Sequence, residues 1–289
     1  MYAVNYLVAK GLMPDVIRPN GFILLRVLGA TILFWLIYSF NYEKVAKKDF
    51  KLLMICAIFG VAINQLFFFN GLMRTSPLNA SIIMMSTPIL VFTLSIFILK
   101  ERPTQIKIIG LITGAAGAIF LFLMNTNVSS NASFSGDLLI LINAISYSIY
   151  MVLVKPLMTK YNALTVITWV FTFGLIYVLI WPYSSMEVIG NPFHTWSSIS
   201  IYKIILVIVG VTFLPYLLTV AAMKHLSPSV ASSYIYLQPV LTSVFIFVSF
   251  QIGSDDYTAD FSILKIFAAI MVFTGVYLVS KKQNLSKVK

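Results

Sequence analysis

The sequence has few charged side chains for its length. Asp, Glu, Lys and Arg make up 10% of its 289 residues, whereas a water-soluble domain of this length carries about 25%. Hydrophobic residues make up 60%, and apolar runs of about 20 residues recur along the whole chain, each long enough to cross a hydrocarbon core of about 30 Å. This composition excludes a soluble globular domain and indicates an all-α polytopic protein surrounded by a lipid bilayer.

Cysteine and histidine are almost absent. The single cysteine, Cys56, lies in an apolar run and cannot form an internal disulfide, so we expect a buried structural thiol. The two histidines, His194 and His225, have no neighbouring ligand residues, so the sequence predicts neither a metal nor a cofactor. A membrane-embedded transferase would need acids or histidines clustered near one interface. No such cluster is present, so we expect no catalytic residues.

Basic residues exceed acidic ones, which gives a formal net charge of +11. Such an excess can indicate nucleic-acid binding, but these residues fall in short loops between apolar runs rather than on one face. Fourteen lie on one side of the expected membrane and five on the other. By the positive-inside rule, both termini are expected in the cytoplasm. We expect no nucleic-acid partner.

Nine complete spans are expected from the apolar runs. They fall at about residues 21–40, 52–72, 78–99, 107–124, 137–155, 164–182, 204–222, 229–251 and 263–280. A short apolar piece over residues 2–13 precedes them. At 1.5 Å per residue, residues 1–13 cover only about 20 Å. Either the first helix is half-length or the true start lies upstream of Met1.

The chain carries an internal repeat. Shifted by 151 residues, SPLNASIIMMSTPIL (76–90) aligns with SPSVASSYIYLQPVL (227–241), and six of the fifteen positions are identical. A second internal match, at a shift of 145 residues, aligns YAVNYLVAK (2–10) with YSIYMVLVK (147–155). Internal symmetry of this kind indicates two related structural units.

The number of spans fixes how the two units are related. Each has five, an odd number, so the second enters the membrane from the opposite side. We therefore expect ten helices, the first truncated, as two inverted five-helix repeats over residues 1–125 and 136–282. Many secondary transporters have this architecture, with the substrate near the midplane between the halves.

A proline interrupts the same helix in each half. Pro88 and Pro239 align at the shift of 151, and each removes the hydrogen bond from the carbonyl four residues earlier, at Met84 and Ile235. The kink is either packed against protein or faces a cavity, where the freed carbonyl meets water or a solute. Its recurrence in both halves favours the cavity. We expect Pro88 and Pro239 to act as hinges.

Two segments carry a family resemblance. They are LMRTSPLNASIIMMSTPILVFTLSIFILKERPTQIKIIGLITGAAG (72–117) and MKHLSPSVASSYIYLQPVLTSVFIFV (223–248). The first runs from a Ser-Pro turn through the mid-helix proline to Glu101 and a Gly-rich fifth helix. This pattern resembles the drug/metabolite transporter superfamily, specifically the EamA-type transporters. The resemblance implies ten helices in two halves. It also implies export of amino acids or related small metabolites across the cell inner (plasma) membrane.

The chain departs from the family pattern in two places. After its ninth helix the second half reads QIGSDDYTADF (251–261), without the expected glutamate. The first helix also lacks its opening half. Full symmetry is therefore not expected at the helix ends.

Polar side chains inside the expected spans are the candidates for contact with a small-molecule substrate. Arg26 is the only full charge deep in a span. It either binds a substrate carboxylate or gates, or else it reaches the outer interface or packs between helices. For the uncharged groups, hydrogen bonding between helices is the alternative. As a set they predict a mixed polar and aromatic pocket. The predicted substrate-binding residues are Arg26, Asn64, Gln65, Phe68, Ser81, Met85, Asn143, Tyr147, Tyr150, Tyr216, Ser232 and Tyr236.

None of the nine acidic residues lies at mid-depth in an expected span. Because proton relays use carboxylates or histidines within the membrane, we expect uniport or weakly coupled antiport. Transport of nucleotide-sugars or other phosphorylated metabolites is an alternative, but it calls for more basic residues than Arg26. A structural or receptor-like protein would explain the hydrophobicity but not the paired prolines. No pattern specifies an oligomeric state.

Overall fold

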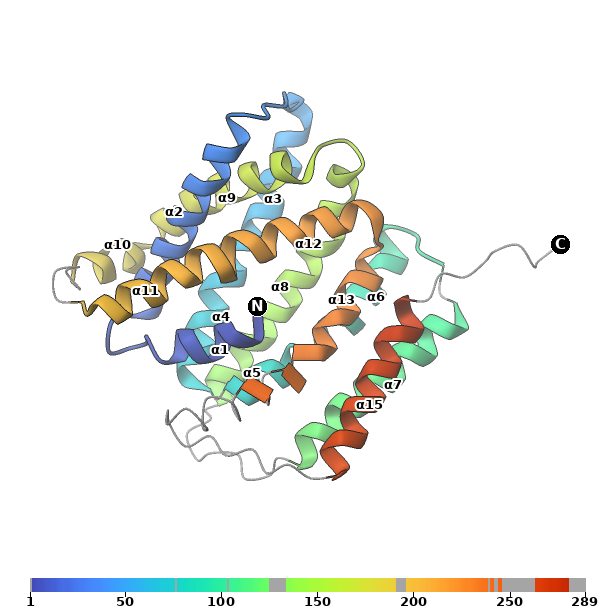
Figure 1. The fold of residues 1–289 in the computed structure, drawn as a ribbon. Helices are drawn as coiled ribbons and strands as arrows, with labels where there is room; N and C mark the ends of the chain where they lie inside the picture. Colours follow the sequence, from blue (N-terminus) through green and yellow to red (C-terminus); the bar gives the residue numbers. More distant parts are fainter. Residues whose placement is uncertain are drawn as a thin grey trace.

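Helices cross the protein in a single bundle (Figure 1). The computed structural model describes residues 2–75, 77–102, 104–124, 134–190, 196–238, 240–241, 244–245 and 263–280. Among these residues, five helical stretches are long and apolar enough to cross a membrane: Pro19–Tyr38, Lys47–Arg74, Phe134–Met158, Ala163–Ile180 and Ser198–His225. The predicted all-α polytopic fold is confirmed.

The first repeat contains α1 to α7. Its elements are α1 (Tyr2–Lys10), α2 (Pro19–Tyr38), η1 (Lys47–Asp49), α3 (Phe50–Ala57), η2 (Ile58–Ala62), α4 (Ile63–Arg74), α5 (Pro77–Ile83), α6 (Ser86–Ile98) and α7 (Gln105–Met124). The stretch α3–η2–α4 is one continuous helix, and α5–α6 replaces the single expected span 78–99. Several helices begin at a proline, where the missing N–H would have no partner inside the helix.

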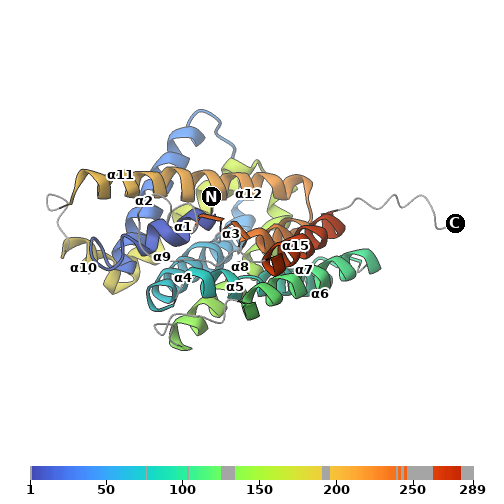
Figure 2. The ribbon, with the colours of Figure 1, turned by 60° about the horizontal axis from the view of Figure 1, so that its bottom comes forward.

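The second repeat contains α8 to α15. Its elements are α8 (Phe134–Met158), α9 (Ala163–Ile180), α10 (Pro182–Ile189), α11 (Ser198–Leu206), η4 (Val207–Phe213), α12 (Leu214–His225), α13 (Pro228–Ser233), η5 (Tyr234–Tyr236) and α15 (Ile263–Ser280). Here α11–η4–α12 is one long helix that crosses the bundle (Figures 1 and 2). The short helix α10 lies beyond the expected span 164–182 and is not predicted by the sequence.

Each repeat contains a π-helical segment at an equivalent place. The segment η2 covers Ile58–Ala62 and η4 covers Val207–Phe213, and a shift of 151 places the first inside the second. A π-bulge leaves carbonyls that the helix itself does not satisfy, and such bulges occur frequently at functional sites. In η2 the freed carbonyls of Phe59 and Gly60 accept hydrogen bonds from Ser146 Oγ at 2.7 Å and from the Tyr216 hydroxyl at 3.3 Å.

Each repeat also breaks its fourth helix at an equivalent place. In the first, α5 ends at Ile83 and α6 begins at Ser86, with Met84 and Met85 in a turn. In the second, α13 ends at Ser233 and continues as a 3-10 turn over Tyr234–Tyr236. The shift of 151 superposes the two breaks.

This geometry corrects the expectation of a kink in a continuous helix at Pro88. The chain breaks before the proline, which then sits in the first turn of α6, where it removes no helical hydrogen bond. The Met84 carbonyl is not left unpaired, because it accepts a bond from the Thr87 N–H at 3.0 Å. Pro239, the second expected hinge, lies outside the described residues.

Two lysines cap equivalent helix ends. Lys10 Nζ donates to the carbonyls of Leu72 at 2.8 Å and Thr75 at 2.7 Å, at the end of α4. Lys155 Nζ donates to the carbonyls of Met223 and Leu226, at the end of α12. These acceptors are the counterparts of Leu72 and Thr75 at the shift of 151. A cation at a helix C-terminus satisfies free carbonyls and complements the helix dipole.

Two glutamates cap helix N-termini across the boundary between the halves. Glu187, on α10, accepts from the backbone N–H groups of Asn20 at 2.8 Å and Gly21 at 3.0 Å, where α2 begins. Glu43, after α2, accepts from the Asn162 N–H at 2.9 Å and the Thr165 hydroxyl at 2.6 Å, where α9 begins. Glu43 and Glu187 are 144 residues apart, close to the 145-residue shift of the first helices. The antiparallel pair α2–α9 is thus tied at both ends.

The pair α7 and α15 packs at the opposite edge of the bundle from α2 and α9 (Figures 1 and 2). The two helices approach so closely that a Cβ on Gly275 would lie 2.5 Å from the Cα of Gly114. Small residues at a crossing allow this contact. Tyr236 attaches the pair to the rest of the protein, because its ring packs against Gly114.

Candidate functional site

A cavity of about 70 Å³ lies between the two repeats. The first repeat contributes Asn5, Tyr6, Arg26, Asn64, Gln65, Phe68, Phe69 and Met84, and the second contributes Asn143, Tyr147, Tyr216, Ile235 and Gln238. Met84 and Ile235, the residues at the two helix breaks, both line it. A cavity of this volume holds only a few water molecules, so a larger solute requires the surrounding helices to separate.

Arg26 is enclosed by protein, with 2% of its surface exposed. Its Nε donates to the Thr212 hydroxyl at 2.9 Å and its Nη1 to Asn5 Oδ1 at 3.4 Å. The guanidinium carbon lies 4.3 Å from the centre of the Phe69 ring, a cation–π contact. These contacts exclude the expectation that Arg26 reaches the outer interface and place its charge at the wall of the cavity.

The π-helical segment η4 positions Thr212 for this contact. The Thr212 hydroxyl donates to the Val207 carbonyl, five residues earlier, at 2.9 Å. Its oxygen therefore remains free to accept the bond from Arg26 Nε. A hydroxyl that both donates and accepts holds the guanidinium in one orientation.

Amide side chains that line the cavity form a buried network. Gln65 Nε2 donates to the Tyr216 hydroxyl at 2.8 Å, and this hydroxyl lies 3.0 Å from Asn64 Oδ1. Asn143 Nδ2 donates to the Asn64 carbonyl at 2.7 Å. Within the described part of the chain, Gln65 Oε1 and Asn143 Oδ1 are buried acceptors without a hydrogen-bond partner. Buried acceptors of this kind are costly unless something pairs with them.

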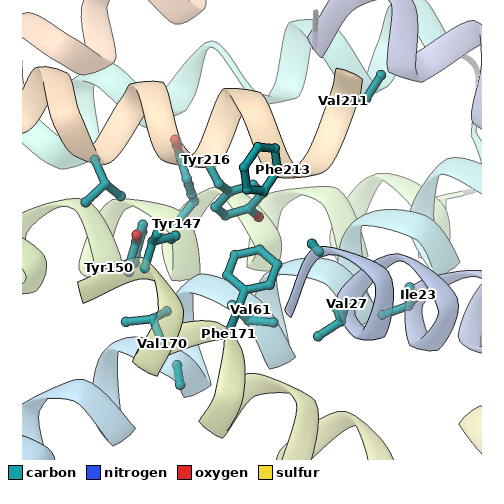
Figure 3. Packing of buried hydrophobic residues seen from close by; sticks show 14 of the residues in the cluster. Ile23, Val27, Val61, Tyr147, Tyr150, Val170, Phe171, Val211, Phe213 and Tyr216 are labelled. Atoms are coloured by element: carbon teal, nitrogen blue, oxygen red, sulfur yellow. The ribbon is translucent and has the colours of Figure 1, made fainter. Parts of the chain in front are cut away.

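Aromatic rings close the remaining sides. Tyr6 and Phe68 pack with ring centres 5.4 Å apart, and the Tyr6 hydroxyl donates to Gln238 Oε1 at 3.0 Å. Figure 3 shows Tyr216 reaching from α12 toward Phe171 on α9, with Tyr147 and Tyr150 nearby on α8. Tyr147, at 9% exposure, lines the cavity, whereas Tyr150 is packed behind it.

Seven of the twelve predicted substrate-binding residues line this cavity: Arg26, Asn64, Gln65, Phe68, Asn143, Tyr147 and Tyr216. They come from α2, α4, α8 and α12. Their role in binding stays a prediction.

The other five predicted residues point elsewhere. The Tyr150 ring packs on η2, where a Cβ on Gly60 would lie 2.4 Å from it. Tyr236 packs against Gly114, and Met85 belongs to the same small core beside α7 and α15. Ser232 and Ser81 are fully buried, and Ser232 Oγ donates to a carbonyl of its own helix at 3.2 Å. The breaks at residues 84–85 and 234–236 turn the predicted helix face away from the cavity.

Several lining residues were not predicted from the sequence. Asn5 and Tyr6 belong to the short first segment, whose length alone was considered, although an amide in an apolar helix was a usable signal. Phe69 lies four residues after Gln65 and so shares its helix face. Gln238 adjoins Pro239, and its polar group in an apolar segment was equally visible.

The charge of the lining comes from Arg26, since the described residues around the cavity include no Asp or Glu. In the part of the chain that the structure describes, no three His, Cys, Asp or Glu side chains gather as a metal site would require. The cavity therefore offers one guanidinium, amide oxygens and aromatic faces, a set that recognises an anionic group together with N–H donors.

An inverted repeat with a polar cavity between its halves defines the chain as a polytopic membrane transporter. The profile of the EamA-like transporter family matches residues 1–123 and 134–281. The chain belongs to this family, and its substrate is a small molecule.

The chain is similar to curated transporters from several microbes, which are described only as uncharacterized. One from Archaeoglobus fulgidus is 23% identical over 86% of this chain and 83% of its own length, and another is 25% identical over 92% and 90%. The transporter YyaM of Bacillus subtilis is 24% identical over 87% and 80%. A crystal structure of 17% identity superposes with a TM-score of 0.72 over 96% of this chain and 92% of that one, which shows the shared fold.

Proposed function

We propose that this protein moves amino acids or related small metabolites across the cell inner membrane by alternating access, in the direction of export. Both termini lie in the cytoplasm, as the distribution of basic residues suggests. The observation that carries the proposal is that one cavity is lined by Arg26 and by two amide side chains whose oxygens have no partner among the described residues.

A zwitterionic solute fits this lining. Arg26 binds the carboxylate, because a guanidinium in a water-poor site forms strong charge-assisted hydrogen bonds. Gln65 Oε1 and Asn143 Oδ1 accept from the ammonium group, since both are buried and have no partner in the described part of the chain. The rings of Phe68 and Tyr147 contact the solute's side chain.

The position of the cavity supports alternating access. It is lined by both repeats and is too small for an amino acid in this conformation. A solute can therefore enter only when the helices separate on one side, and the paired breaks at residues 84–85 and 234–236 provide flexible points near the cavity.

Phosphorylated metabolites such as nucleotide-sugars fit less well. A phosphate dianion calls for several cations, and among the described lining residues only Arg26 carries a positive charge. The absence of acids at mid-depth in the sequence favours uniport or weakly coupled antiport over proton symport.

Transport in reconstituted vesicles tests the proposal. Uptake and efflux of a panel of labelled amino acids are measured for the wild type, Arg26→Gln and Asn143→Leu. We expect Arg26→Gln to abolish transport of every amino acid, and esterification of the solute's carboxylate to abolish transport by the wild type. Asn143→Leu is expected to raise KM, because it removes an acceptor for the ammonium.

Lys203→Gln is the matched control, because Lys203 is a cation on α11 outside the cavity. Wild-type rates are expected for this variant. If Arg26→Gln transports amino acids as well as Lys203→Gln does, the proposed carboxylate site is wrong. If no amino acid moves but a phosphorylated metabolite does, the alternative substrate class replaces the first.

A further inference from the structure

A second cavity, of about 640 Å³, opens where α2 begins and α4 ends. We call it the Arg18–Arg74 crevice. Its walls are formed by Pro14, Arg18, Pro19, Asn20, Leu66, Phe67, Asn70, Met73, Arg74, Leu139, Trp181, Tyr183 and Glu187. Its volume falls in the range of about 300–1,000 Å³ that is typical of ligand sites.

The crevice is separate from the central cavity, because α4 stands between them. Gln65, Phe68 and Phe69 face the central cavity, whereas Leu66 and Phe67 face the crevice. Opposite faces of α4 therefore line two different cavities. The site proposed for the transported solute does not account for the crevice.

The positive charge of the crevice is only partly neutralised. Arg18 is exposed, and its side chain makes no hydrogen bond or ion pair that the structure records among the described residues. The acid in the crevice, Glu187, is already engaged, since it accepts from the Asn20 and Gly21 N–H groups and from Asn20 Nδ2 at 2.7 Å. Arg18 therefore contributes a positive charge to the rim of the crevice, which Arg74 also lines.

The walls of the crevice change from charged and aromatic to apolar along the membrane normal. The arginines, Trp181 and Tyr183 lie at helix ends, and the two aromatic side chains are 45% and 57% exposed, as is typical of the interfacial aromatic belt. Leu66, Phe67 and Leu139 lie farther into α4 and α8 and form an apolar wall. A cationic rim above an apolar groove complements the anionic headgroup and the apolar acyl chains of a phospholipid.

We propose that the Arg18–Arg74 crevice binds a phospholipid with an anionic headgroup. The two guanidinium groups hold the phosphate and the headgroup, and an acyl chain lies against Leu66, Phe67 and Leu139. Arginine suits this role because its planar fork matches phosphate oxygens. A lipid is favoured over a water-soluble phosphate because the apolar wall formed by Leu66, Phe67 and Leu139 can bind an acyl chain, which a soluble ion lacks.

Native mass spectrometry of the purified full chain tests the site. The delipidated protein is titrated with phosphatidylglycerol and with phosphatidylcholine of the same acyl chains. We expect phosphatidylglycerol to be retained preferentially. Arg18→Gln and Arg74→Gln should each weaken its binding by about fivefold, as the loss of one basic residue near an anionic lipid predicts. Arg18→Gln alone keeps the test valid, because the Arg18 side chain makes no bond within the described part of the chain that folding could require.

Lys203→Gln serves as the control, being a cation outside the crevice. Equal retention of the two lipids would overturn the role of the headgroup. Unchanged phosphatidylglycerol binding in the double variant Arg18→Gln/Arg74→Gln would overturn the location. Displacement of the lipid by glycerol 3-phosphate at equal concentration would identify a soluble-anion site instead. Transport of amino acids is measured separately, so failure here leaves the proposed function untouched.

Discussion

Gln65 and Tyr216 are joined by a hydrogen bond of 2.8 Å, from Nε2 to the hydroxyl, and they are 151 residues apart. This separation is the shift that relates the second repeat to the first along these helices. The bond therefore connects equivalent positions of the two halves and lies on their pseudo-two-fold axis. At this point the two repeats contact each other in the interior, beside the cavity that both of them line.

Tyr216→Phe should weaken the junction between the repeats. The variant leaves Gln65 Nε2 buried without its acceptor and removes the hydroxyl beside Asn64 and the Gly60 carbonyl. We expect the free energy of unfolding to fall by about 1–3 kcal/mol, measured by thermal unfolding in detergent. Tyr177→Phe is the control, because Tyr177 makes no such bond in the described part of the chain. Equal stability of the two variants would contradict the prediction.

The helices could be predicted from the sequence because the surrounding lipid requires helical structure. In lipid each backbone group must be paired within its own segment, so apolar runs become helices and loops collect the charges. The span expected at 263–280 matches α15 at both ends, and the one at 21–40 is displaced from α2 by two residues. The repeat was visible because identical turn residues recur at a fixed separation.

The helix faces could not be predicted equally well. Ser81, Met85, Ser232 and Tyr236 were assigned to the cavity on the assumption of an unbroken helix with a kink. A two-residue break changes the direction of the side chains that follow it. No residue type in the sequence predicts a break three residues before a proline. Met84 and Ile235 reach the cavity for this reason, while Met85 and Tyr236 turn toward α7 and α15.

The glutamate caps make a prediction about rigidity. Glu43→Gln and Glu187→Gln each remove a charge from the N-terminus of a helix in the other repeat, so each should lower the free energy of unfolding by about 1 kcal/mol. Because the two contacts lie at opposite membrane faces, the double variant should show the sum. Thermal unfolding measures both effects. Asp15→Asn, an exposed acid outside both caps, should leave the midpoint unchanged.

If only one of the two glutamate variants lowered the free energy of unfolding, the prediction would be contradicted. The caps also restrict how the protein opens, since α2 and α9 are held together at both ends at once. Rocking of two rigid halves would break one cap in each state. Opening elsewhere in the bundle, near the breaks in the fourth helix of each repeat, leaves both caps intact.

Asp49 gives a pH-dependent prediction. Asp49 precedes α3 and lies outside the expected span 52–72. Hydrogen bonds from Lys160 at 2.9 Å and from the Tyr161 hydroxyl at 2.8 Å hold the pKa of Asp49 below its ordinary value. A carboxyl with a depressed pKa stabilises the folded state above its unfolded pKa of about 3.9, and this contribution is lost as the pH falls through the folded pKa. The difference in melting temperature between the wild type and Asp49→Asn should be constant near neutral pH.

Below about pH 4 this difference should shrink, because the wild-type carboxyl becomes protonated. Melting curves recorded in detergent at a series of pH values provide the measurement. The acid dependence of Asp15→Asn should follow that of the wild type throughout. A gap between the wild type and Asp49→Asn that persists unchanged at the acid end would mean that the charge of Asp49 does not stabilise the fold.

Pro88→Leu tests whether the break in the fourth helix serves transport. Leucine restores an N–H at position 88, which can bond the Met84 carbonyl and draw α5 and α6 into one helix. Near-normal membrane insertion is expected, because the substitution is apolar. Transport should slow by about tenfold, which corresponds to about 1.4 kcal/mol in the barrier, since the flexible turn beside the cavity is lost. Pro239→Leu should behave alike if the repeats are functionally equivalent.

Pro182→Leu is the matched control for these variants, because this proline stands at the first position of α10, away from the cavity. Initial rates in vesicles, normalised to the amount of inserted protein, separate slow transport from poor insertion. Straightening of the helix is checked independently by the distance between spin labels at residues 78 and 94. Rates for Pro88→Leu and Pro239→Leu that both equal the Pro182→Leu rate would show that the breaks shape the cavity without bending during transport.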